Sequence, residues 1–487
     1  MISELRVNQR NKEKPDPKGK YVLYRLQIHR RFQWNHALEY AVNRANEHDK
    51  PLLIYEGLRC DYPWASDRFH RFIMESMQEL QEEAAGRVQY IPFIEYEPGE
   101  EPAFYETLAS EAVEVISDEY PVFIMREQNN RTAKECGVRY TTVDANGIIP
   151  LEATEKAAYN AYFFRKIVQR TFPDFYRAAP DNDPLSNLGN RESLDLPDKI
   201  RDGAERSRND LEDISKCISR LPIDHEVEPV ASPGTRKAAI EEFEDFIEHR
   251  LDRYHEEANQ PDNSAASNMS PWLHFGKISP FEITRRVFEQ QPGKWSLDDL
   301  VDQNGSRGSY FSDDPNIESY LDEVITWREV GFHFAWHEEE IDTFESLPDW
   351  VRETLNEHRS DTRPYVYTLE EFEQAETHDE IWNAAQRQLR REGVIHNYLR
   401  MLWGKKILEW TPDPETALAY MIELNNKYAV DGRDPNSYSG IFWCLGRFDR
   451  PWPERKIYGK VRYMSSDSTR KKCRLSGYLQ RYDSLSQ

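Results

Sequence analysis

Between residues 21 and 143 the chain alternates short apolar runs with longer helical patterns, and this alternation constrains the fold more than any other feature. Strands are predicted at residues 21–28, 52–58, 88–94, 113–117 and 140–143, with helices at residues 34–48 and 66–85. Apolar runs that alternate with helices are typical of a parallel, doubly wound sheet. No GxGxxG sequence follows the first run, so the dinucleotide fingerprint is absent.

The length of 487 residues exceeds what one hydrophobic core usually organises, so we expect two domains and connections. Residues 1–18 are polar and charged and are predicted to form a flexible N-terminus, followed by an α/β domain over residues 19–151. Mixed charges and the sequence PDNDP predict a surface connector over residues 152–234. From residue 235 to residue 487, helical patterns with aromatic faces predict an all-α domain.

The apolar runs, the N-terminus and the cysteines indicate the cellular compartment in which the protein is expected to work. No apolar run approaches about 20 residues, so we expect no membrane span. The first 20 residues lack the apolar core of a secretory signal. The five cysteines are scattered without a CxxC pair, which fits a reducing cytoplasm and argues against bound zinc or an iron–sulfur cluster.

Charge is distributed unevenly along the chain. The formal net charge is −24, yet residues 395–487 carry 16 Lys and Arg against 10 Asp and Glu. A basic end on an acidic body is compatible with phosphate binding. The acidic excess is interpreted as a solvated surface, of the kind that a high-salt cytoplasm favours.

The run from Ile395 to Trp410 predicts a helix, because it contains good helix formers and no proline before Pro412. Trp403 and Trp410 are seven residues apart, which is two turns and roughly 10 Å along one helix face. Trp382 lies on the preceding helical pattern. From spacing alone, core packing is the usual explanation of tryptophans at helical intervals.

Three sequence blocks carry a family resemblance. They read HDEIWNAAQ at residues 378–386, HNYLRMLWGKKILEW at 396–410 and LNNKYAVDGRDPNSY at 424–438. Together they resemble the photolyase/cryptochrome flavoproteins, and specifically the class II cyclobutane pyrimidine dimer photolyases.

The resemblance implies an α/β antenna domain followed by a helical FAD-binding domain. It also implies light-driven repair of DNA, in which excited FADH⁻ passes an electron to the pyrimidine dimer and receives it back. Trp382, Trp403 and Trp410 would relay electrons to oxidised FAD. A second pigment of deazaflavin or folate type is a further expectation, although nothing in residues 19–151 identifies one.

The resemblance also names cofactor-binding residues. Ser270 followed by Pro271 predicts an N-cap and the first turn of a helix, a natural anion site that the family uses for the FAD diphosphate. An ion pair between Arg400 and Asp431 would favour the anionic flavin, and Asn425 would face flavin N5. The full predicted set is Tyr254, Ser267, Asn268, Met269, Ser270, Arg400, Asn425, Asp431 and Arg433.

Lesion contacts are implied for Asn268, Glu329 and Trp443, the last by stacking on the flipped-out dimer. The triplet Trp327-Arg328-Glu329 departs from the RRE of the class II pattern. Phosphate contacts are expected from Arg447, Arg450 and Lys456.

We therefore expect a monomeric, cytoplasmic enzyme that acts on UV-damaged DNA with FAD and without a metal. Two alternatives stay open at this point: a cryptochrome-like photoreceptor without repair activity, and a (6-4) photolyase.

Overall fold

The structure, a computed structural model, describes residues 2–291, 293 and 296–483. Its strands are β1 (Val7–Gln9), β2 (Tyr21–Arg25), β3 (Leu52–Leu58), β4 (Gln89–Ile94), β5 (Ala112–Asp118) and β6 (Tyr140–Val143). They form one sheet in the order β1-β6-β5-β2-β3-β4. The pairing of β1 with β6 is antiparallel and every other pairing is parallel. The predicted parallel sheet is confirmed, with an antiparallel edge strand added.

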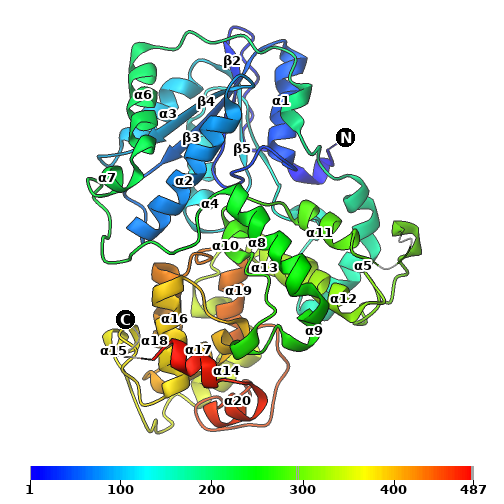
Figure 1. The fold of residues 1–487 in the computed structure, drawn as a ribbon, viewed down its shortest axis with the longest axis vertical. Coiled ribbons are helices and arrows are strands. Elements are labelled where there is room, and N and C mark those ends of the chain that lie inside the picture. Colours follow the sequence, from blue (N-terminus) through cyan, green and yellow to red (C-terminus); the bar gives the residue numbers. More distant parts are fainter. Residues whose placement is uncertain (1, 292, 294–295, 484–487) are drawn as a thin grey trace. The chain divides into compact units, whose positions relative to one another are not determined.

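Both faces of the sheet are covered (Figure 1). Val22 and Tyr24 enter the apolar layer shared with α1 (His36–His48). Tyr21 and Leu23 point the other way, into the layer shared with α3 (Glu100–Ala109) and α6 (Asp198–Glu212). Because successive side chains alternate between two buried layers, the strands consist of continuous apolar runs.

The chain divides into two compact units, each assembled from distant segments. The sheet unit comprises residues 1–155, 171–243 and 269–290, and the helical unit comprises residues 156–170, 244–268 and 291–487. All six strands belong to the sheet unit.

The remaining elements are helices. The sheet unit also contains α2 (Asp67–Ala84), α4 (Phe123–Glu135), α7 (Ile214–Ile218), α10 (Ser270–His274) and α11 (Pro280–Phe288), while α5 (Ala161–Arg177) and α8 (Arg236–His249) have residues in both units. The helical unit contains α9 (Tyr254–Glu257), α12 (Pro315–Leu321), a π-helix (Asp322–Trp327), α13 (Arg328–His337), α14 (Asp349–Glu357), α15 (Leu369–Glu373), α16 (Glu380–Glu392), α17 (Asn397–Trp410), α18 (Pro414–Tyr428), α19 (Pro435–Cys444), α20 (Ser466–Lys472) and α21 (Ser476–Arg481). Among the described residues, no helix has both the length and the apolar character needed to cross a bilayer.

The predicted domain boundaries need three corrections. The N-terminus expected to be flexible contains β1, whose backbone pairs with β6. The expected connector over residues 152–234 contains α5, α6 and α7, and α6 buries one apolar face against the sheet. The region expected to be purely helical from residue 235 contributes residues 235–243 and 269–290 to the sheet unit.

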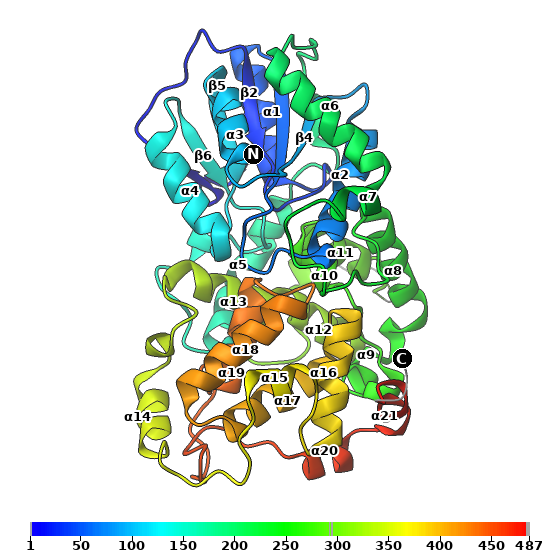
Figure 2. The same cartoon turned by 90° about the vertical axis from the view of Figure 1, so that its left-hand side faces the viewer.

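Helices α16 to α19 of the helical unit pack side by side (Figure 2). The side chain of Asp379 caps α16 by accepting from the backbone N–H groups of Ile381 and Trp382, and Gly393 ends it at φ 69°. Helix α17 starts two residues after the predicted Ile395 and ends at Trp410, as predicted.

Candidate functional site

A cavity of about 760 Å³ lies within the helical unit. Its wall includes residues of α9, α12, the π-helix, α17 and α19, together with the loop before α12. Of the residues predicted from the sequence, Tyr254, Arg400 and Trp443 line this cavity. The sequence therefore identified three residues of one cavity wall, although Tyr254 and Trp443 are almost 200 residues apart in the chain.

The π-helix contributes Asp322, Glu323 and Trp327 to the wall. The indole N–H of Trp327 donates to the Asp322 carboxylate at 3.0 Å. Arg165 of α5 donates two hydrogen bonds to the same carboxylate, at 2.9 and 2.7 Å. A paired carboxylate therefore fixes the orientation of the Trp327 ring.

Two indoles stack at the cavity. The ring centroids of Trp327 and Trp443 are 4.9 Å apart with an interplanar angle of 27°. The guanidinium groups of Arg307 and Arg165 lie 5.0 and 5.7 Å from the Trp327 ring. Among the described residues, the buried indole nitrogen of Trp443 has no hydrogen-bond partner. The pair forms an aromatic surface at the cavity that is suited to stacking on an aromatic ligand.

Glu323, which sequence reasoning missed, is one of four carboxyl side chains that line this cavity, with Asp313, Glu318 and Asp322. Glu323 is an exposed residue whose side chain lies at the cavity wall. Partial desolvation at this wall, helped by the charge of Asp322, raises the pKa of Glu323 to about 7, although Arg307 and Arg165 oppose the shift. The predicted Glu329 is buried in α13 and does not line the cavity.

The predicted pair between Arg400 and Asp431 is formed. One guanidinium nitrogen of Arg400 lies 3.2 Å from both carboxylate oxygens of Asp431. Arg400 lines the cavity, whereas Asp431 lies behind it. The pair thus holds one positively charged group at the cavity wall.

Asn425 and Arg433 lie behind the wall. The amide of Asn425 donates to Ser437 Oγ at 2.7 Å and to the side-chain oxygen of Asn426 at 3.2 Å. The same Asn426 oxygen accepts from the backbone N–H of Arg433, at 3.0 Å, where Arg433 adopts φ 63°. These contacts shape the loop that precedes α19, and neither predicted residue lines the cavity.

The three predicted tryptophans form a buried series, in an order that the sequence did not give. The Trp382 ring is 6.4 Å from Trp403 and 6.2 Å from Trp410, between centroids. Trp382 donates its indole N–H to the Trp403 carbonyl at 3.0 Å, and Trp403 donates to Gln386 at 2.9 Å. Trp382 of α16 therefore bridges the two indoles of α17.

Beyond Trp410 the aromatic series continues to the surface through residues that sequence reasoning missed. Tyr367 lies 5.8 Å and His378 4.9 Å from Trp410, between centroids. The Tyr367 hydroxyl is 2.7 Å from His378 Nδ1. Tyr365, an exposed ring, stacks on His378 at 3.7 Å. The three buried indoles thus reach solvent through two tyrosines and a histidine.

The predicted phosphate-binding stretch differs from the expectation. The N-cap of α10 is Met269, and Ser270 is the first helical residue, without a side-chain cap bond. Ser267 and Asn268 belong to the helical unit, whereas Met269 and Ser270 belong to the sheet unit. Asn268 is exposed at φ 58°, and none of the four residues lines the cavity.

The C-terminal cations fall into two kinds. The Arg447 guanidinium lies 4.0 Å from the Phe334 ring centroid and donates to the Ser346 carbonyl. Arg450 and Lys456 are exposed, and neither forms an ion pair with another described residue. Of these three predicted residues, Arg450 and Lys456 are the exposed ones.

Comparison with known proteins identifies relatives of this chain. A protein of Methanothermobacter thermautotrophicus named deoxyribodipyrimidine photo-lyase is 34% identical over 488 aligned positions, which cover 100% of this chain and 99% of the relative. A Potorous tridactylus protein of the same name is 31% identical over 92% of this chain and 79% of its own. No protein-family model matches the chain.

Solved structures include a similar fold. The crystal structure of a class III photolyase from Agrobacterium tumefaciens matches with a TM-score of 0.65 and 16% identity, over 96% of this chain and 86% of that one. The identity over the full length of the Methanothermobacter relative establishes the family: this chain belongs to the deoxyribodipyrimidine photo-lyases.

Proposed function

We propose that the protein uses light and bound FAD to repair cyclobutane pyrimidine dimers in DNA, and that its two units correspond to a photolyase α/β domain and a helical FAD-binding domain. The observation that carries the proposal is the cavity wall on which the stacked indoles, Glu323 and Arg400 converge. Membership of the photo-lyase family supports it. The direct test is dimer cleavage by purified protein in blue light and in darkness.

The residues at the cavity fit FAD. Tyr254 offers an aromatic edge and Arg400 a guanidinium, so the wall combines ring surface with positive charge. When bound and reduced, FAD supplies the electron that splits the dimer after light absorption. Arg400, held in place by Asp431, would favour an anionic ring system, and Tyr254 would support it. One FAD per chain should be released on heating.

The dimer would be bound by Trp327, Trp443 and Glu323. Aromatic rings recover stacking energy that is lost when bases leave the duplex. A carboxyl group with a pKa near 7 can donate a hydrogen bond to a pyrimidine carbonyl while protonated. We therefore assign to Glu323 the role that the sequence suggested for Glu329.

The Glu323 assignment predicts pH-dependent lesion binding. Because its pKa is raised to about 7, the proton-donating form predominates below pH 7. Affinity for dimer-containing DNA should fall as the pH rises from about 6 to about 8. Glu323→Gln, which donates at every pH, should make the profile flat. Glu329→Gln is the matched control and should keep the wild-type profile. An equal decline in Glu323→Gln would refute the assignment.

Phosphate binding should depend on the two exposed cations. Arg450→Gln and Lys456→Gln should each reduce the slope of log affinity against log salt by about one unit, equally for damaged and undamaged duplexes. Arg447→Gln should instead lower the melting temperature, since Arg447 packs on Phe334. Salt titrations and thermal melts of the three variants separate these effects. If Arg450→Gln leaves the slope of log affinity against log salt unchanged, Arg450 does not contact DNA phosphates.

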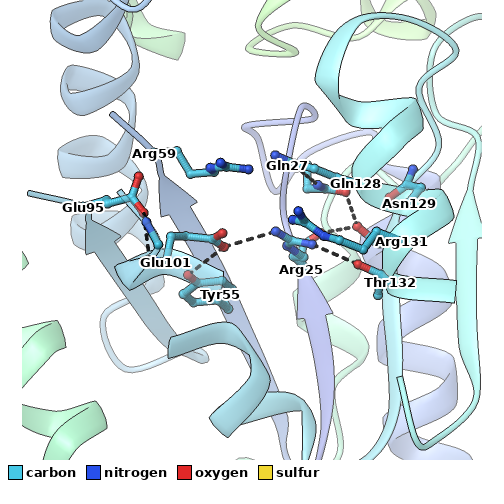
Figure 3. A network of polar contacts seen from close by, with 12 residues as sticks. Arg25, Gln27, Tyr55, Arg59, Glu95, Glu101, Gln128, Asn129, Arg131 and Thr132 are labelled. Atoms are coloured by element: carbon cyan, nitrogen blue, oxygen red, sulfur yellow. Dashed lines mark hydrogen bonds and ion pairs between the residues drawn. The ribbon is translucent and has the colours of Figure 1, made fainter. Parts of the chain in front are cut away.

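A second, light-harvesting pigment of deazaflavin or folate type is proposed in the sheet unit, at the carboxyl ends of the strands. A cavity of about 360 Å³ there is lined by Arg59, Gln128, Arg131 and neighbouring residues. Around it, Gln27 donates to Gln128 at 2.8 Å, and Arg25 lies between Glu101 and Thr132 (Figure 3). Ligands of doubly wound sheets bind at this edge. Absorbance of purified protein beyond that of FAD would support the pigment.

A further inference from the structure

Three exposed aromatic rings gather at the start of α5, in the helical unit. Tyr159, Tyr162 and Phe163 are 58%, 44% and 49% exposed. They make up three of the eight large hydrophobic side chains that are exposed among the described residues. Single exposed apolar residues are common, but a cluster indicates a binding surface.

Two of these rings are held in fixed positions. The side chain of Asn160 accepts from the backbone N–H groups of Tyr162 and Phe163, at 3.1 and 3.2 Å. Lys166 Nζ lies 4.6 Å from the Tyr162 centroid and 5.7 Å from that of Phe163. Gly305, at φ 85°, approaches so closely that a β-carbon there would be 3.2 Å from the Tyr162 ring. A ring ordered in advance loses little entropy on binding.

Hydrogen bonds connect this surface to the cavity wall. The amide of Gln169 donates to the Ser306 carbonyl at 3.0 Å, and its oxygen accepts from the Gly305 N–H at 2.7 Å. The same loop continues into Arg307, which lines the cavity beside Trp327. Arg165, one turn along α5 from Tyr162, donates two hydrogen bonds to the carboxylate of Asp322 in the cavity wall. Helix α5, which carries the exposed rings, is therefore joined to the cavity wall through Gln169 and Arg165.

Charge at this surface suits a polyanion. Lys166 and Arg307 form no ion pair with any of the residues that the structure describes. On a chain with a net charge of −24, unpaired cations beside exposed rings give a local site where DNA is attracted.

We propose that Tyr162 and Phe163 stack a base of the DNA just outside the lesion cavity, while Lys166 and Arg307 contact the adjoining phosphates. This inference rests on the proposed function, since it takes the cavity as the lesion site. Removal of a dimer from the duplex leaves neighbouring and opposite bases without their normal partners. An aromatic surface accepts any base, because every base offers a π-face. The site would thus hold the duplex open without reading its sequence.

The test uses FAD-loaded protein and duplexes with one dimer, in which 2-aminopurine replaces a base beside or opposite the lesion. The double variant Tyr162→Ala/Phe163→Ala should bind the damaged duplex about tenfold more weakly. At one of the labelled positions, quenching of 2-aminopurine by the wild-type rings should be lost. Val366→Ala, another exposed apolar position, should change neither value. Lys166→Gln and Arg307→Gln should each reduce the salt slope by about one unit.

Trp443→Ala, measured in parallel, separates the claim that the rings of α5 bind DNA from the proposed function of dimer repair. If it abolishes the preference for damaged DNA while the double variant binds within about twofold of wild type, the α5 surface is refuted and the proposed function stands. If the wild-type protein shows no such preference, both claims fail. A double variant that changes only the sedimentation of the free protein would assign the rings to self-association and overturn the inference.

Discussion

Trp382→Phe is expected to reduce light-driven reduction of bound FAD to the level of a dark control. Trp382 is the ring through which Trp403 and Trp410 are connected, at centroid distances of 6.4 and 6.2 Å. Phenylalanine fills most of the same space but is much harder to oxidise than an indole. The substitution therefore breaks the electron route at its middle while disturbing the core less than alanine would.

The measurement is the loss of oxidised-flavin absorbance under blue light with an external reductant. Trp350→Phe, on α14 and outside the series, is the matched control and should behave as wild type. Chemically reduced Trp382→Phe should still repair dimers, because the series only supplies electrons to oxidised FAD. Normal photoreduction in Trp382→Phe would mean that the three indoles serve packing alone.

Trp443→Ala should weaken binding of dimer-containing DNA by about 1–3 kcal/mol and leave undamaged DNA nearly unaffected. The reason is that Trp443 lines the cavity and stacks on Trp327, so that it can contact only a base that has left the duplex. Parallel affinity measurements on matched duplexes give the difference directly.

A double-mutant cycle sharpens this prediction. Since Trp327 and Trp443 are in contact, their effects should not add, and the double alanine variant should lose less than the sum of the single losses. Equal weakening of both duplexes by Trp443→Ala would remove its role in lesion stacking.

Sequence reasoning predicted the elements that are buried or strongly periodic. The strands from β2 to β6 were recognisable because both faces of the sheet are covered, which requires continuous apolar runs. Strand β1, with the sequence Val-Asn-Gln, has no such signal, because its position depends on pairing with β6. Helices α3 to α7 were missed, since charged residues on their outer faces obscure the apolar ones.

At the site, Arg400 and Trp443, which the family blocks carry, line the cavity, whereas the predicted stretch from Ser267 to Ser270 does not. Glu323 of the π-helix faces the cavity, whereas Glu329 is buried in α13. The family motif marked only Glu329, and the sequence alone does not show which of the two carboxyl groups faces a cavity. The position of Trp382 between Trp403 and Trp410 likewise depends on the packing of α16 against α17.

The central claim, light-driven repair, is tested most directly by one measurement. Purified protein with reduced FAD is mixed with a duplex that carries one cyclobutane dimer, and restoration of the two pyrimidines is followed in blue light and in darkness. We predict multiple turnovers in light and none in darkness. Intact dimers after illumination of protein that binds FAD and the damaged duplex would contradict the account.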